Sequence, residues 1–137
     1  MKLFPLASVA AIALLAAACS GNDGEIKIQA VQTPLTDQGK DTLFTVELVK
    51  ARDGGYATDA FKVKVIPAGK DAVEVTCVLN DLNLSKKLDA GDTLACSEGT
   101  ENKLGVDIAG KAAQVELFAT IDGAEERIGD ATWTPVK

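Results

Sequence analysis

Apolar and polar residues alternate with a period of two along most of the chain after residue 24. A β-strand places successive side chains on opposite faces, so this alternation indicates strands with one buried face and one exposed face. The pattern predicts seven to nine short strands. The candidate stretches are residues 25–30, 44–49, 61–65, 73–79, 82–84, 93–96, 104–108, 114–121 and 127–134.

Turn-forming residues separate these stretches. Asp53-Gly54-Gly55 follows the second stretch, and Asp122-Gly123 lies between two β-like runs, where an Asp-Gly pair predicts a tight hairpin. The resulting expectation is an all-β domain, an antiparallel two-sheet sandwich with one internal disulfide, and a small closed barrel is the alternative. The strand rhythm resembles that of bacterial immunoglobulin-like domains, which implies an immunoglobulin-like sandwich.

The first residues of the chain differ from the rest. Lys2 precedes an uncharged apolar run over residues 3–18, and small residues close the run. These are the positive, apolar and cleavage regions of a secretory signal peptide, so we expect a signal helix that is removed after residue 18. The alternative is an uncleaved transmembrane helix. It is disfavoured because the run is near the short limit of about 17 residues and no positive flank follows it.

The sequence Leu14-Leu15-Ala16-Ala17-Ala18-Cys19 resembles the lipobox of bacterial lipoproteins. The resemblance implies that Cys19 becomes the triacylated first residue, and Ser20 implies sorting to the outer membrane. Ala16 departs from the family, which usually has leucine there, and the same residues also fit an ordinary secretory cleavage site. The expected organisation is a signal peptide at 1–18, a lipidated cysteine and tether at 19–24, and a β domain at 25–137.

Size and charge narrow the possible partners. Removal of residues 1–18 from the 137-residue chain leaves 119 residues, which is enough for one domain with its own core. Lys2 is the only charged residue removed, so the net charge of −6 becomes −7. This acidic balance disfavours binding to nucleic acid and electrostatic docking on anionic lipid.

Two cysteines remain in the predicted domain, Cys77 and Cys96. Export to an oxidising compartment and the single possible pairing predict a disulfide between them. Both lie in strand-like runs at positions that share a face with apolar residues, so both sulfurs are expected to point into the core. Their loop length corresponds to a stabilisation of about 3 kcal/mol. The single tryptophan, Trp133, is expected to pack in the core, whereas Phe118 falls on the polar face of its strand.

Candidate chemistry is sparse. The chain has no histidine, which removes the commonest general base and metal ligand, and Ser85 and Lys86 would point to opposite faces of a strand. We therefore expect no enzymatic activity, no catalytic residue and no cofactor beyond the lipid. No metal site is assigned either. Asp81, Asp89 and Asp92 are the candidates for binding Ca²⁺, although turns use aspartate for backbone hydrogen bonds as well.

These observations predict a non-enzymatic, lipid-anchored protein of the bacterial cell envelope that acts as a binding or structural module. Its expected partners are the outer membrane, through the anchor, and another envelope protein. The domain would face the periplasm or the cell surface. The alternative is a surface lipoprotein that binds a small ligand or calcium.

Overall fold

Seven of the alternating stretches form strands in the computed structural model, which describes residues 24–137. The strands are β1 (Glu25–Ala30), β2 (Thr42–Lys50), β3 (Phe61–Ile66), β4 (Val73–Asn80), β5 (Thr93–Ser97), β6 (Ala113–Ile121) and β7 (Ala124–Trp133). A short 3-10 helix, η1 (Val106–Ile108), lies between β5 and β6. The all-β expectation is therefore confirmed. The predicted signal peptide, the lipidation at Cys19 and the tether up to residue 23 lie outside the described residues.

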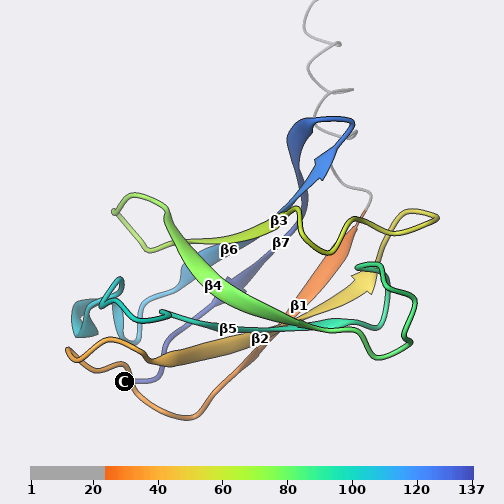
Figure 1. The fold of residues 1–137 in the computed structure, drawn as a ribbon. Coiled ribbons are helices and arrows are strands. Elements are labelled where there is room, and N and C mark those ends of the chain that lie inside the picture. The colour runs from red at the N-terminus through yellow and green to blue at the C-terminus, as the bar shows by residue number, and fades with distance from the viewer. Residues whose placement is uncertain (1–23) are drawn as a thin grey trace, which may run out of the picture.

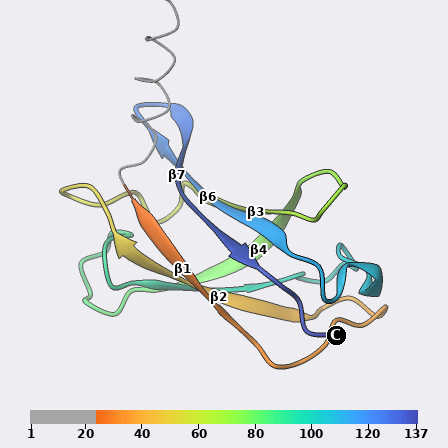
Figure 2. The same cartoon turned by 180° about the vertical axis from the view of Figure 1, so that it is seen from behind.

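The strands form one antiparallel sheet in the order β1-β2-β5-β4-β3-β6-β7 (Figure 1). The sheet curls until its two edge strands, β1 and β7, lie side by side, which gives it a nearly closed, barrel-like shape (Figure 2). Glycine permits this close approach. A Cβ atom on Gly129 of β7 would lie 3.1 Å from Cγ2 of Ile26 on β1, and one on Gly24 would lie 2.5 Å from the Ile128 carbonyl oxygen.

Strand β4 is shared between the two halves of the sheet. Its first residues pair with β3 over a ladder of three residue pairs, from Val63–Val75 to Val65–Val73. Its remaining residues, Thr76 to Asn80, pair with β5. Figure 1 shows β4 crossing between these neighbours, so β3 and β4 diverge after their short ladder.

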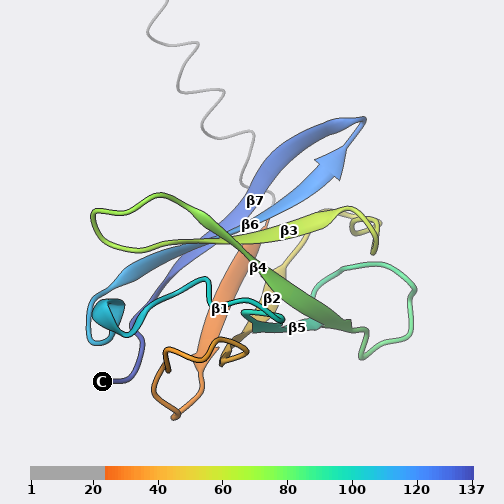
Figure 3. The same cartoon turned by 60° about the vertical axis from the view of Figure 1, so that its left-hand side comes forward.

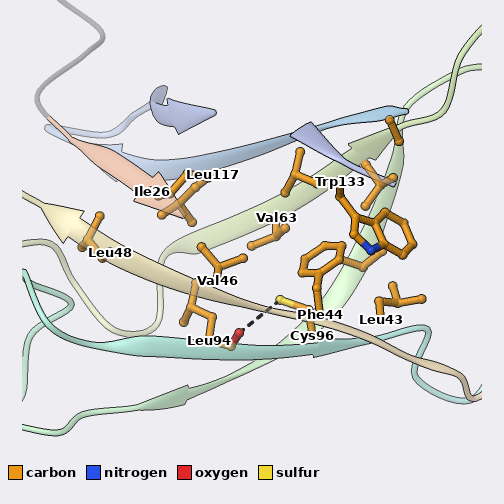
Figure 4. Close-up of a cluster of buried hydrophobic side chains, with 14 of the residues drawn as sticks. Ile26, Leu43, Phe44, Val46, Leu48, Val63, Leu94, Cys96, Leu117 and Trp133 are labelled. Atoms are coloured by element: carbon orange, nitrogen blue, oxygen red, sulfur yellow. Dashed lines mark hydrogen bonds between the residues drawn. The ribbon is translucent and has the colours of Figure 1, made fainter. Parts of the chain in front are cut away.

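The core lies inside the curled sheet, and the alternation of the sequence matches it. Val63 and Val65 of β3 are buried, as are Val115 and Leu117 of the neighbouring β6. Trp133 is buried as expected and packs edge-on against Phe44, with ring centroids 4.9 Å apart (Figure 4). Phe118 is half-buried on the outer face, where the Lys64 ammonium lies 4.7 Å from its ring centroid.

Two predicted strands are wrong. Residues 104–108 form a loop and η1. Leu104 and Ile108 are the buried residues of this stretch, and their spacing of four residues fits one helical turn as well as a strand. Residues 82–84 lie in an exposed loop. Leu84 there has a φ of 58°, a left-handed conformation that a strand residue does not adopt.

The predicted disulfide between Cys77 and Cys96 is present. The two residues face each other directly on β4 and β5, with their Cα atoms 4.1 Å apart. Cys96 is buried, whereas Cys77 is only half-buried, so the expectation of two core-facing sulfurs holds fully for Cys96 alone. The disulfide links the second half of β4 to β5, the strand with which β4 pairs after it has diverged from β3.

We predict that reduction of this disulfide lowers the free energy of unfolding by about 3 kcal/mol, because the open chain regains the entropy of the loop between the cysteines. Urea unfolding with and without a reductant measures the difference. A Cys77→Ala/Cys96→Ala variant is the control, and its midpoint should not respond to the reductant. Equal midpoints for the oxidised and reduced wild type would contradict the prediction.

Candidate functional site

The three candidate calcium ligands from the sequence, Asp81, Asp89 and Asp92, lie close together in the loop between β4 and β5. Asp81 directly follows β4, Asp92 directly precedes β5, and Asp89 lies between them. One carboxylate oxygen from each of the three lies within 4.8 Å of the others. The two adjacent strands therefore bring residues far apart in the loop to one point.

Hydrogen bonds within the loop already use these carboxylates. The fully buried Asp92 accepts the backbone N–H groups of Leu82, at 3.1 Å, and Asp89, at 3.0 Å. Asp81 accepts the backbone N–H of Lys86 at 2.7 Å. These bonds close the loop, which is the ordinary role of aspartate in turns. The carboxylates shape the loop whether or not they also hold an ion.

Burial raises the pKa of the Asp92 carboxyl above its ordinary value, and the nearby Asp89 and Asp81 charges add to this effect. The pKa of Asp89 is lowered, chiefly by the hydrogen bond that its carboxylate accepts from the Asn83 side chain at 2.9 Å. The loop thus brings three carboxylate groups, with their negative charge, close together. Such an arrangement suits a hard cation such as Ca²⁺, which takes about six to eight oxygen ligands, and does not suit metals that prefer nitrogen or sulfur.

A second feature is a pocket of about 320 Å³ at the point where β3 and β4 diverge, which we call the β3–β4 groove. It takes in the start of β3, the middle of β4 and parts of two loops. Its lining residues are Thr58, Asp59, Phe61, Lys62, Val63, Glu74, Val75, Thr76, Cys77 and Lys103. Both charge signs and two hydroxyl groups are therefore available to a ligand.

The walls of the groove are held by specific contacts. Lys103 donates from its ammonium to the carbonyl oxygen of Glu74 at 3.0 Å, which fixes the loop after β5 against β4. Lys62 forms an ion pair with Glu125 at 3.3 Å on the outer face of the sheet. Thr76 is exposed on β4 beside Cys77, which is pinned by the disulfide. A hydrogen bond, an ion pair and the disulfide thus hold residues on the different sides of the groove.

Sequence reasoning missed one buried charged residue, Glu98. Its side chain is completely buried just after β5 and accepts the backbone N–H groups of Lys103 and Leu104, both at 2.6 Å, and that of Asp41 at 3.4 Å. It thereby joins the loop after β5 to the loop before β2. Only its position between a strand and Gly99 could have drawn attention to it, and many surface glutamates share that setting.

Ser85 lies in the exposed loop after β4 and is not part of a strand. Its hydroxyl donates to the carbonyl oxygen of Lys87 at 3.2 Å and accepts the backbone N–H of the same residue at 3.1 Å. These bonds use the hydroxyl to shape the bend that leads into Leu88.

Comparison with known protein families, with curated protein sequences and with solved structures finds no match. Among residues 24–137, no helix is long and apolar enough to cross a membrane.

We predict that Glu98 makes stability depend on pH. Burial raises the pKa of its carboxyl above the ordinary value of 4.5. The folded state therefore binds this proton more strongly than the unfolded state, and the resulting stabilisation is complete below pH 4.5 and lost as the pH rises through the raised pKa. The wild type should gain stability relative to a Glu98→Gln variant as the pH falls from 7 to about 4, measured by urea unfolding.

A Val106→Ala variant is the matched control, since it alters an exposed residue of the neighbouring η1 helix and removes no titratable group. The stability difference between the wild type and this control should stay constant over the same pH range. A difference between the wild type and Glu98→Gln that is flat, or that moves in the opposite direction, would contradict the prediction.

Proposed function

We propose that this protein is a non-enzymatic, lipid-anchored module of the bacterial cell envelope that binds a partner protein through the β3–β4 groove. The anchor is supported by the lipobox-like residues that end at Cys19 and by the β domain that begins at Glu25, directly after a short polar tether. The covalent lipid would hold the domain on the outer membrane, facing the periplasm or the cell surface. The groove is the observation that carries the binding role.

We further propose that the domain is an immunoglobulin-like sandwich whose two sheets are joined through β4. In immunoglobulin-like domains the first, second, fifth and fourth strands form one sheet, and the third, sixth and seventh form the other. The order β1-β2-β5-β4 followed by β3-β6-β7 supports this assignment. One difference from antibody domains is that the disulfide joins the neighbouring strands β4 and β5, where antibody domains bridge their two sheets.

The chemistry of the groove defines what it would bind. Lys62 and Lys103 offer hydrogen-bond donors, Glu74 and Asp59 offer acceptors, and Phe61 gives an apolar contact. This mixed lining suits a polar peptide segment, whose backbone needs both donors and acceptors, better than an apolar small molecule. A segment that runs along the groove would lie between two diverging strands, so both walls would contact it.

We predict that a photoreactive benzophenone amino acid in place of Thr76 crosslinks the full-length, lipidated protein to a discrete envelope protein in living cells. Thr76 is exposed and lines the groove, so a bound partner lies within reach of the probe. The same amino acid at Lys27, an exposed position on β1, is the control and should give no such adduct. No adduct at position 76, or the same adducts at both positions, would overturn the binding role of the groove.

The second candidate function is calcium binding by the β4–β5 loop, because the oxygens of Asp81, Asp89 and Asp92 converge. The loop would supply three carboxylate oxygens, and water or carbonyl oxygens would complete the coordination. The negative charge gathered there would favour the ion, whereas the backbone hydrogen bonds to Asp81 and Asp92 would compete with it.

If the loop binds calcium, millimolar Ca²⁺ should raise the melting temperature, since a ligand at about 100 times its Kd adds about 2.7 kcal/mol of stability. An Asp89→Asn variant should lose this response, because it removes one of the three charged oxygen ligands, whereas Asp81 and Asp92 keep the backbone hydrogen bonds that shape the loop. Asp53→Asn, at an exposed position in the neighbouring loop, should keep the response. The absence of a thermal shift in the wild type would eliminate calcium binding.

A further inference from the structure

The alternation of strand directions places several loops at the end of the sheet where β1 begins. β1 begins at this end with Glu25, β2 ends here with Lys50, and β4 ends here with Asn80. The end therefore carries loops 51–60 and 81–92 and the hairpin turn at 122–123, and we call it the tether end (Figures 1 and 3). The C-terminus, loop 67–72 and the segment 98–112 lie at the opposite end.

Backbone hydrogen bonds connect the β4–β5 loop to the start of the domain. Ile26 of β1 pairs with Leu48 of β2. Leu48 in turn accepts the backbone N–H of Gly91 at 2.8 Å and donates to the carbonyl oxygen of Asp92 at 3.0 Å. The base of the loop is thus separated from β1 by one strand, or about 10 Å. The segment from Cys19 to Gly24 can span at most about 18 Å, so a lipid on Cys19 would hold this end close to the bilayer.

The same loop displays two large apolar side chains to solvent. Leu84 is 81% exposed and Leu82 is 60% exposed. Together with Val78 on β4 and Val106 in η1 at the opposite end, they are the large hydrophobic residues exposed among residues 24–137. Exposed apolar side chains that lie close together mark interaction surfaces more often than single ones do.

The loop holds these leucines in place at a conformational cost. Leu84 and Lys86 have φ values of 58° and 64°, which are unfavourable for residues with a Cβ atom. The Asp81 carboxylate holds this bend by accepting the N–H groups of Ser85 and Lys86, and the Asp81 carbonyl oxygen accepts the N–H of Leu84 at 3.3 Å. The loop is therefore built to keep Leu84 directed away from the core.

We propose that the β4–β5 loop docks on the bilayer that holds Cys19, with Leu82 and Leu84 inserted at the boundary between headgroups and acyl chains. This inference rests on the lipid anchor of the proposed function and adds a second, apolar contact to it. One lipid-attached segment and one apolar loop at the same end would fix the orientation of the domain. Because the domain is acidic overall, we assign the contact to apolar insertion rather than to attraction by anionic lipid.

The test uses the full-length lipidated protein in phosphatidylcholine vesicles, with or without lipids brominated on their acyl chains, which quench nearby tryptophan. A Leu84→Trp variant places a reporter on the loop, and Val106→Trp places a matched reporter at the opposite end. The native Trp133 is buried and remains as a constant background in both variants. We expect brominated lipid to reduce the added emission of Leu84→Trp at least about twofold and to leave Val106→Trp unchanged.

Two controls separate this inference from the proposed anchor. The intact mass of the mature protein reports the lipid on Cys19, and flotation with vesicles reports membrane attachment. An unmodified Cys19 overturns both the anchor and the docking. A lipidated protein that floats while Leu84→Trp stays unquenched, or is quenched no more than Val106→Trp, overturns the docking alone. A Leu84→Trp reporter that is shielded from solvent in whole cell envelopes but not on vesicles would show that a protein partner covers the loop. This result would also overturn the docking on the bilayer.

Discussion

The path of β4 is the constraint on which the rest of the domain depends. A strand that pairs with β3 for three residue pairs and then with β5 for the remainder must cross the space between the two halves of the sheet. The crossing lets one sheet curl far enough to bring β1 beside β7, and the same divergence opens the β3–β4 groove. The Cys77–Cys96 disulfide lies just beyond the crossing and holds the departing half of β4 against β5. Closure of the core and the opening of the β3–β4 groove thus have one cause.

The loops at the two ends of the sheet are each held by a buried carboxylate. Asp92 at the tether end and Glu98 at the opposite end are the buried acidic residues among residues 24–137, and they flank the short strand β5. Each accepts N–H groups of neighbouring loop backbone, which burial would otherwise leave without partners. Both carboxyls have raised pKa values because burial disfavours the charged form. Backbone donors compensate for part of that cost and give the loops defined conformations.

The sequence predicted the strands well wherever one face of a strand is buried. In such a strand every second side chain is buried, and this produces the alternation of apolar and polar residues. Residues 61–65 and 114–121 are clear examples, and Asp122-Gly123 marked its hairpin correctly. The pattern failed at Leu104 and Ile108, whose buried side chains point inward from a loop and η1. It could not reveal Glu98 because the acceptor role depends on loops distant in sequence. The groove was equally inaccessible, since strand divergence is decided by pairing partners and leaves no periodic signal.

The three aspartates show which features of the β4–β5 loop can be inferred from the sequence and which cannot. Asp81 and Asp92 flank β4 and β5, so their proximity follows once those strands pair. The predicted disulfide implied only that Cys77 and Cys96 are close, because a disulfide can also bridge two sheets, as it does in antibody domains. The sequence could not show that their oxygens are engaged by backbone N–H groups or that the resulting bend exposes Leu84. Those features arise from loop conformation, which includes positive φ values at residues other than glycine.

The positions of the groove and of the tether are complementary. In the strand order the junction of β4 and β3 is near the middle of the sheet, whereas β1, which carries the tether, is at one edge and lies beside β7. In a curled sheet these two places fall on opposite walls. The groove is lined by the start of β3 and the middle of β4, with Thr58 and Asp59 from the tether-end loop 51–60 and Lys103 from the opposite-end segment 98–112, so it runs along the side of the domain between the two ends. A domain held at the membrane by Cys19 and by the β4–β5 loop would therefore present the groove laterally, where a partner could reach it without displacing the anchor.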